Sequence, residues 1–353
     1  MTSFSIYHVL HLPKYFAART AFVPLVEKLE ATPVYYDIAW EKVAEKSWTL
    51  SHLLRRAGIA YYGSAWNALV PVWDELKMAR AMSAAGPRIV HFLYGDFATP
   101  RSRRLFRRKQ DRLIGTFHAS QRKQPSVLLP RLDLRVYDFL TVVSETEIPF
   151  LVSRGFPAER IRTIPLGVDT DFFRPDPAWK PFAGSIRAIL VGSTERDHAF
   201  AAEVMRRLPA GCVTLSVATS REQQAHYRNV PGVSILPWLS DEELVKAYQQ
   251  AELLFMPMLD CTANDAILEA MACGTPVMAN RVGGIPEYVD ASSAFTFESK
   301  NADEWAEVLQ SLMKQRERLA AMRSDVRRWA ERFGWNVLAG RYYALYQEAF
   351  EQP

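Results

Sequence analysis

With 353 residues, of which 49% are hydrophobic and 23% charged, the chain is too long for one ordinary core and too apolar for a disordered protein. Its formal net charge of +4 is too small to indicate that it binds nucleic acid. We therefore expect a folded protein of two domains.

The three cysteines, Cys212, Cys261 and Cys273, do not indicate a zinc site, because they form no Cys-x-x-Cys pair and have no histidine pattern near them. A sparse, odd number of cysteines is typical of a reducing compartment. The N-terminal sequence lacks the basic start and long apolar run of a signal peptide, and no apolar stretch is long enough to span a membrane. These features predict a cytoplasmic protein that could also contact the inner face of a membrane peripherally.

Short apolar runs, which predict strands, alternate with longer segments of helical spacing. In the first half of the chain the predicted strands are residues 4–12, 88–94, 112–118 and 139–144. In the second half they are residues 186–192, 213–219, 233–238, 253–258 and 276–280. Strands that are apolar throughout and separated by helices indicate parallel sheets. Two such sets predict an α/β protein with two doubly wound domains.

The boundary between the two sets is predicted at residues 165–184, which are rich in Pro, Gly and Asp and carry no hydrophobic period. We expect an N-terminal domain at residues 1–167 and a C-terminal domain at residues 168–335. Residues 336–353 have the spacing of a helix, which could cross back to the N-terminal domain.

Residues 260–277, DCTANDAILEAMACGTPV, follow a predicted strand and open a helix. Thr262 and Asp265 have the spacing of a capping box at its start. Ligands of doubly wound sheets bind at the carboxyl ends of the strands, so the N-terminus of this helix is expected to face a ligand. Its unpaired N–H groups and its dipole suit a phosphate, and Asn264 adds an amide donor.

One carboxylate, Glu269, interrupts the apolar run of this helix. It lies roughly 7 Å along the helix axis from Asn264, about the reach from a nucleotide diphosphate to its ribose. A carboxylate can accept two hydrogen bonds side by side and therefore matches a vicinal diol. Phosphate at the helix N-terminus and ribose at Glu269 would together form a nucleotide site. The alternative is that Glu269 is solvent-exposed on an amphipathic helix, as a lone helical glutamate usually is.

The segment from Asn264 to Val289, NDAILEAMACGTPVMANRVGGIPEYV, resembles the signature of the retaining glycosyltransferases of family 4. Other segments resemble that family in the expected order, at residues 115–120, 140–147, 155–175 and 233–257. The resemblance covers about residues 88–345. It implies the GT-B fold, in which two Rossmann-like domains face each other across a cleft. It also implies a nucleotide-sugar donor held by the C-terminal domain and an acceptor held by the N-terminal domain.

The resemblance implies roles for single residues. Glu269 corresponds to the glutamate that binds the donor ribose, and His118 corresponds to the histidine near the sugar and the reacting centre. The other positions that correspond to donor contacts are Thr262, Ala263, Asn264 and Asp265 at the diphosphate and sugar, Gly192 after the first strand of the second domain, and Trp238 and Leu239 at the nucleobase.

The chain departs from the family pattern at two places in the donor site. Cys261 stands where a second glutamate is usual, and either the neighbouring Asp260 takes over the contact with the sugar hydroxyls, as we expect, or the contact is absent. Where the family carries an arginine and then a lysine aimed at the diphosphate, this chain has Ser193 and, near the lysine position, His198. Arg196 is the predicted substitute cation, because arginine binds phosphate through two parallel hydrogen bonds.

The reaction implied by the resemblance is retaining transfer of a sugar from a nucleotide-diphosphate sugar to a glycan, lipid-linked or small-molecule acceptor. A UDP-sugar is favoured as the donor, with a GDP-sugar next, and no metal or further cofactor is expected. The candidate catalytic residues are Arg196, which would stabilise the leaving diphosphate, His118, which would orient the sugar, and Asp260. Two alternatives keep the fold: a nucleotide-sugar epimerase, and a donor-binding but inactive partner of another transferase.

Residues 101–112 form a basic segment with seven Lys or Arg residues and one acid. The segment is either a solvated helix face or a contact for an anionic acceptor or an anionic membrane surface.

Overall fold

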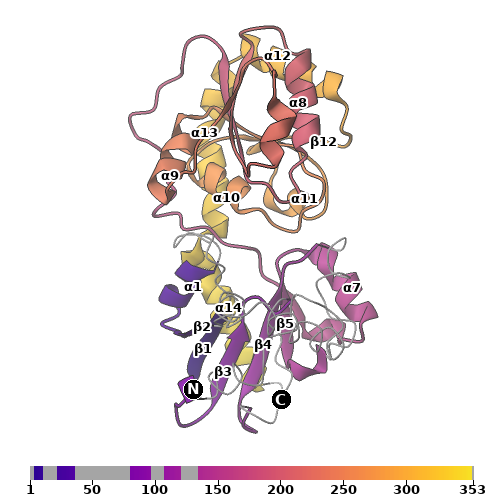
Figure 1. Cartoon of the computed structure of the whole chain (residues 1–353). Helices are drawn as coiled ribbons and strands as arrows, with labels where there is room; N and C mark the ends of the chain where they lie inside the picture. The colour runs from indigo at the N-terminus through magenta and orange to yellow at the C-terminus, as the bar shows by residue number, and fades with distance from the viewer. Residues whose placement is uncertain (1–3, 11–21, 36–79, 97–106, 121–133, 352–353) are drawn as a thin grey trace, which may run out of the picture. The chain divides into compact units, whose positions relative to one another are not determined.

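The computed structural model describes residues 4–10, 22–35, 80–96, 107–120 and 134–351, and these form two compact units (Figure 1). Among the described residues, unit 1 contains those up to Pro165 together with the C-terminal residues from Ala339 on. Unit 2 contains Leu166–Leu338. Residues 164–185, all of them described, hold one isolated bridge but neither a helix nor a strand.

Unit 1 is built on a six-stranded parallel sheet in the order β2-β1-β3-β4-β5-β6. Its strands are β1 (Ser5–Leu10), β2 (Thr32–Tyr35), β3 (Arg88–Phe92), β4 (Arg112–Phe117), β5 (Phe139–Val142) and β6 (Ile161–Thr163). The described helical segments are α1 (Val23–Lys28), η1 (Leu134–Val136), η2 (Glu145–Glu147), α7 (Ile148–Ser153) and η3 (Ala158–Arg160).

Unit 2 repeats this plan with a second six-stranded parallel sheet, in the order β12-β11-β10-β7-β8-β9. Its strands are β7 (Ile186–Val191), β8 (Val213–Ala218), β9 (Val233–Ile235), β10 (Leu253–Met256), β11 (Val277–Asn280) and β12 (Ala294–Phe297). Its helices are α8 (His198–Arg207), η4 (Gln223–Tyr227), α9 (Asp241–Gln250), α10 (Asp265–Ala272), α11 (Ile285–Tyr288), α12 (Ala302–Lys314), α13 (Glu317–Ala330) and η5 (Glu331–Phe333).

The two parallel sheets confirm the predicted fold class, and all nine predicted strands are present. Three further strands, β2, β6 and β12, were not predicted, and each lies at an edge of its sheet. An edge strand packs against fewer neighbours, so it needs no continuous apolar run, and β2 even contains Pro33. The edge strand β9 is shorter than predicted and stops at Ile235, before Pro237.

The core of unit 2 is centred on Trp305 of α12, which is fully buried. Its ring stacks on Phe297 at 4.4 Å and meets Phe200 and Phe255 edge to face at 5.3 and 5.5 Å between ring centroids. Aromatic pairs at these distances add to the stabilisation that burial supplies, so they clamp α8 and α12 onto one face of the sheet.

The last helix, α14 (Trp335–Glu351), begins in unit 2 and runs along the sheet of unit 1 (Figure 1). Its Tyr346 hydroxyl contacts both a nitrogen of His8 at 2.9 Å and Nδ1 of His91 at 2.6 Å. The other His91 nitrogen contacts the hydroxyl of Thr116 at 2.7 Å. Burial lowers the pKa of His8 to about 3 and also lowers the pKa of His91, so both rings are neutral at neutral pH. The side chains of this network are all buried. The network fixes α14 against β1, β3 and β4.

Candidate functional site

The loop that follows β10 leads directly into α10, as predicted, but the residue that caps the helix is Asn264. Asn264 has an extended backbone, and its Oδ1 accepts a hydrogen bond from the N–H of Ile267 at 3.2 Å. The predicted capping box of Thr262 and Asp265 is wrong, because the helix begins at Asp265 itself. The polar residues in this loop thus belong to the N-terminus of a helix whose remaining N–H groups suit an anion.

Glu269 lies inside α10 with only 4% of its surface exposed, so the alternative of a solvent-exposed helix face is wrong. The hydroxyl of Tyr248 in α9 donates a hydrogen bond to Glu269 Oε2 at 2.9 Å. Burial, and then the charge of Asp265, raise the pKa of the Glu269 carboxyl to about 8. A buried carboxyl with a shifted pKa that is held by a fully buried tyrosine is typical of a functional site.

Arg196 brings a cation to the N-terminus of α10. Its Nη2 donates to Asn264 Oδ1 at 3.3 Å, while Nε and Nη1 donate to the carbonyls of Val191 at 3.1 Å and Thr194 at 2.7 Å. Burial lowers the pKa of Arg196 from its usual value, and the nearby acidic groups, Asp265 and Glu269 among them, oppose that shift. The guanidinium therefore stays charged beside the helix N-terminus.

Backbone pairing between two loops holds Arg196 in this place. Arg196 and Met258 form an antiparallel bridge, Leu259 N–H donates to the Glu195 carbonyl at 2.8 Å, and Asp197 N–H donates to the Pro257 carbonyl at 2.8 Å. Glu195 itself has a φ of 59°, a left-handed conformation that few non-glycine residues adopt. The turn after β7 is thereby joined to the loop after β10.

Gly192 makes room for this arrangement. Its φ of 100° is favoured only by glycine, and a Cβ at this position would lie 2.7 Å from the guanidinium of Arg196. The predicted site residues Gly192, Arg196, Asn264 and Glu269 therefore lie together at the carboxyl end of the unit 2 sheet.

His198 is the first residue of α8, and it is buried. Its Nδ1 contacts the Tyr227 hydroxyl at 2.8 Å, and its Nε2 contacts the Gly192 carbonyl at 3.1 Å. Burial lowers its pKa to about 4, so the ring is neutral at physiological pH. These bonds favour a role in holding the turn at Gly192 over the predicted direct contact with a ligand, which stays a prediction.

The loop of Asp260 and Cys261 packs tightly against a second loop. Asp260 is partly exposed, and its Oδ1 accepts a hydrogen bond from the Cys261 N–H at 2.8 Å. The Cys261 carbonyl accepts from Gly284 N–H at 2.7 Å, and a Cβ at Gly283 would lie 1.9 Å from that carbonyl. Burial raises the pKa of the Cys261 thiol to about 12, so a neutral thiol occupies the position where family 4 members usually carry an acid.

Trp238 and Leu239 lie between β9 and the N-cap of α9, Ser240. Trp238 is 84% exposed, and Leu239 is partly buried. An exposed indole offers a flat surface on which an aromatic ring could stack. The predicted contact of Trp238 and Leu239 with a nucleobase stays a prediction.

In unit 1, His118 directly follows β4, and the buried carboxylate of Asp96 lies beside it. His118 Nδ1 is 2.8 Å from Asp96 Oδ1, and Asp96 Oδ2 accepts hydrogen bonds from the N–H groups of Ala119 at 2.7 Å and His118 at 3.1 Å. The ring of Tyr94 lies 5.0 Å from the His118 ring, and that of Phe22 lies 6.2 Å away. The His118 ring is thus held in one orientation with 21% of its side chain exposed.

Comparison with known families covers both units. A family model described as Glycosyltransferase Family 4 matches residues 7–172, and one described as Glycosyl transferases group 1 matches residues 186–315. The chain belongs to the family 4 glycosyltransferases. The GT-B fold of this family accounts for the two parallel sheets, one in each unit.

Individual relatives match parts of this chain. The MMP alpha-(1->4)-mannosyltransferase of Mycolicibacterium hassiacum is 29% identical over 236 residues, which are 62% of this chain and 56% of the relative. A D-inositol 3-phosphate glycosyltransferase of Thermobispora bispora is 35% identical over 34% of this chain and 28% of its own. The chain thus spans little more than half the length of the first relative and less of the second.

A solved structure resembles this chain over nearly its whole length. HepE of Anabaena, in complex with UDP and glucose, covers 98% of this chain with a TM-score of 0.67 at 15% sequence identity. At this identity the likeness concerns the fold alone.

The residues that the structure describes offer neither a cluster of metal ligands nor a helix that could span a membrane. Within those ranges, no group of three or more His, Cys, Asp or Glu residues could hold a metal ion. None of the helices found there combines the length and the apolar character that crossing a membrane requires.

Sequence reasoning missed one residue of the site, Tyr248, and one pairing, that of Asp96 with His118, although the position of Asp96 after a predicted strand had suggested that it could line the cleft. Tyr248, which holds Glu269, was hidden because tyrosines on an amphipathic helix usually serve the core, and the spacing of 21 residues between the two gives no local signal. The bonds between Asp96 and His118 also depend on neighbouring strands, β3 and β4, and not on sequence proximity.

Proposed function

We propose that the protein transfers a sugar from a nucleotide-diphosphate sugar to a glycan, lipid-linked or small-molecule acceptor, with retention of the anomeric configuration. The observation that carries this proposal is the cluster of Arg196, Asn264 and Glu269 in unit 2, in a chain that belongs to the family 4 glycosyltransferases. Donor binding can be tested without knowledge of the acceptor, because Arg196, Asn264 and Glu269 all lie in unit 2.

The diphosphate of the donor binds, in this proposal, at the N-terminus of α10. Breaking the bond between the sugar and the diphosphate leaves negative charge on the leaving group. Arg196 and the N–H groups at the N-terminus of α10 are fixed in place before the reaction and stabilise that charge as it develops. The leaving phosphate then takes the proton of an acceptor that attacks from the same face, which retains the configuration.

Glu269 binds the ribose diol of the donor. Its Oε2 already accepts a hydrogen bond from Tyr248, which orients the carboxyl group and leaves Oε1 for the ligand. A carboxyl that keeps its proton to a pH of about 8 can donate one hydrogen bond and accept another, and a diol can supply the partner for both. Donor binding is expected to couple to this proton.

Uridine is the proposed base of the donor, with guanosine second. Support comes from the fold shared with HepE, whose structure holds UDP and glucose. The exposed indole of Trp238 is the proposed surface for the base.

Asp260, the partly exposed acid of the loop before α10, is proposed to contact the sugar hydroxyls in place of the missing glutamate at Cys261. If the acceptor is lipid-linked, the protein also contacts a membrane, which flotation with vesicles of that lipid measures.

The test is a panel of UDP- and GDP-sugars, with nucleotide release measured in the presence and absence of lipid and sugar acceptors. Nucleotide release that depends on an acceptor supports the proposal. Tight nucleotide binding without turnover on any donor supports an inactive binding partner, and a donor that returns with an inverted stereocentre supports an epimerase. Glu269→Ala should abolish donor binding, whereas Glu242→Ala, which removes an exposed carboxylate of α9, should leave it unchanged.

A further inference from the structure

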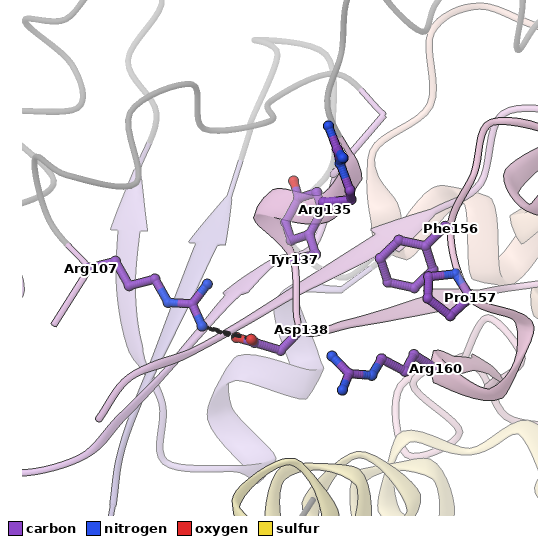
Figure 2. Close-up of a pocket in the computed structure, with 7 residues that line it drawn as sticks. All are labelled: Arg107, Arg135, Tyr137, Asp138, Phe156, Pro157 and Arg160. Carbon is purple, nitrogen blue, oxygen red and sulfur yellow. Dashed lines mark hydrogen bonds and ion pairs between the residues drawn. The ribbon is translucent and has the colours of Figure 1, made fainter. Parts of the chain in front are cut away.

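A pocket of about 300 Å³ lies in unit 1 at the amino-terminal ends of β4, β5 and β6 (Figure 2). The segments that lead into these three strands line it with arginines, one acid and two aromatic rings: Arg107, Arg135, Tyr137, Asp138, Phe156 and Arg160. Arg107, from the described part of the basic segment, therefore lines a pocket.

This pocket is distinct from the site that contains His118. His118 follows the carboxyl end of β4, whereas Arg107 precedes the amino end of the same strand. Across a strand of six residues the two ends are about 20 Å apart at the usual rise per residue. Ligands of doubly wound folds bind at the carboxyl ends, so the reaction does not account for a charged pocket at the opposite edge.

Hydrogen bonds fix the shape of the pocket. Arg107 Nη2 donates to both carboxylate oxygens of Asp138, at 2.6 and 2.9 Å, and Arg107 Nη1 donates to the Val136 carbonyl at 3.3 Å. Asp138 Oδ2 also accepts from Leu113 N–H at 2.8 Å. The Tyr137 ring packs on Gly115 of β4, where a Cβ would lie only 2.8 Å from the ring. The side chains of Arg107, Tyr137 and Asp138 are therefore held in place by contacts within unit 1.

The charges in the pocket do not cancel. Arg107 and Asp138 form an ion pair, and Arg160 adds a further guanidinium to the pocket lining. In Figure 2, Arg160 extends toward Asp138 from the side opposite Arg107, while the Arg135 side chain points away from both. Among the described residues, the Arg160 side chain has neither a hydrogen bond nor an ion pair. A guanidinium in such a position matches the oxygen atoms of a phosphate group.

We propose that this pocket binds a phosphate ester, with Arg160 as the main ligand. The rings of Tyr137 and Phe156 form an apolar wall for the organic group that the phosphate carries. A volume of about 300 Å³ lies at the lower end of the range for small-molecule sites and suits a phosphate with a short organic group. A soluble phosphate ester and the headgroup of an anionic phospholipid share this chemistry.

Equilibrium dialysis of the full chain with radiolabelled inorganic phosphate tests the proposal in four proteins: wild type, Arg160→Ala, Arg196→Ala and the double variant. We expect Arg160→Ala to weaken one class of phosphate sites about tenfold, the loss of one charge-assisted hydrogen bond of about 1.4 kcal/mol. Arg196→Ala should weaken a separate class, at the proposed donor site. The two effects should add, because the residues lie in different units.

The controls separate this pocket from general attraction to positive charge. Arg221→Ala removes an exposed arginine of unit 2 and should leave both classes unchanged. Arg160→Lys should recover part of the affinity, because lysine keeps the charge but not the two-pronged geometry. Phosphate binding that is equal in wild type and Arg160→Ala overturns the proposal, whatever Arg196→Ala shows. If Arg196→Ala does not weaken phosphate binding, the result counts against the proposed donor site and not against this pocket.

Two further arms distinguish the sources of the phosphate. Phenyl phosphate should bind more tightly than inorganic phosphate if the ligand is a soluble ester that uses the aromatic wall. Vesicles of phosphatidylglycerol, compared with vesicles of phosphatidylcholine, should compete with inorganic phosphate if the ligand is a lipid headgroup. Either result supports a phosphate-ester site. Vesicle binding that is equal in wild type and Arg160→Ala, with no binding of either soluble phosphate, contradicts it.

Discussion

Tyr248 donates a hydrogen bond to Glu269 at 2.9 Å, and both side chains are almost completely buried. The bond joins α9 to α10, so the carboxyl group proposed to bind ribose is positioned by a neighbouring helix and not by its own. The bond also lowers the pKa of Glu269 against the larger, opposite effect of burial.

Tyr248→Phe should weaken binding of the donor nucleotide by about fivefold, since one hydrogen bond contributes about 1 kcal/mol. It should also raise the pKa of Glu269 further, because the hydroxyl stabilises the charged carboxylate. Calorimetric titration with UDP between pH 6 and pH 9 measures both effects. Tyr343→Phe removes the hydroxyl of a half-exposed tyrosine in α14 and should change neither. Equal affinities for wild type and Tyr248→Phe at every pH would show that the bond does not position Glu269.

The raised pKa of Glu269 makes stability depend on pH. The pKa of the Glu269 carboxyl is about 8 in the folded protein, whereas the ordinary value of a glutamate, which applies to the unfolded chain, is 4.5. Between these values the unfolded chain has lost the proton and the folded chain still holds it, so the free energy of unfolding falls as pH rises from about 4.5 to 8. Glu269→Gln should therefore stabilise the protein at pH 8 by about 3.5 kcal/mol relative to its effect at pH 5.

Urea denaturation of wild type and Glu269→Gln at pH 5 and pH 8 gives this difference. Glu242→Gln, at an exposed position of the neighbouring helix, serves as the control and should show the same change at both pH values. A stabilisation by Glu269→Gln that does not grow with pH would mean that the buried carboxyl titrates normally.

Gly192→Ala should displace Arg196 as well as strain the backbone. The φ of 100° alone is expected to cost about 1–2 kcal/mol for a residue with a Cβ, and the contact at 2.7 Å forces the guanidinium away. Gly211→Ala is the matched control, because its φ is 78° but no atom lies within 4 Å of the added Cβ. Both variants should lose stability in thermal unfolding, and only Gly192→Ala should lose affinity for UDP. Similar UDP affinity in the two variants would contradict the placement of Arg196 at the diphosphate.

Trp238→Ala should weaken binding of the donor nucleotide by about tenfold, because stacking on an aromatic side chain contributes about 1–3 kcal/mol per base. Since the side chain is 84% exposed, its removal should leave the melting temperature unchanged. Trp238→Phe keeps an aromatic surface and should recover most of the affinity. Fluorescence titration with UDP and with inorganic pyrophosphate separates base from diphosphate, and an equal loss for both ligands would rule out a base contact.

Asp96→Asn should lower kcat by about tenfold, the cost of about 1.4 kcal/mol in the barrier when His118 loses its charged partner. The neutral amide can still accept from the N–H groups of His118 and Ala119, so the fold of the loop should persist. Asp96 lies in unit 1, and UDP binding in unit 2 should therefore be unaffected. His118→Ala should lower kcat at least as much. A normal kcat in both variants would remove His118 from the reaction.

Sequence periodicity was sufficient for the central strands of both sheets and for α9 and α14, because their apolar patterns are long and continuous. It was insufficient for the edge strands β2, β6 and β12, which are short and half-solvated. The start of α10 was misplaced because two polar residues before it, Thr262 and Asn264, carry the same capping signal. Local rules do not decide between such neighbours, since the choice depends on how the loop packs.

By itself, the sequence determined the alternation of strands and helices, the helix that begins near Asn264 and the family signature that includes Glu269, because these depend on residues close together in the chain. Only the tertiary structure decided that Glu269 is buried against Tyr248 and that pairing between the loops after β7 and β10 brings Arg196 to Asn264. Burial and contact between distant segments depend on which elements pack together, and it is this packing that shifts the pKa of Glu269 and gathers the charges of the site.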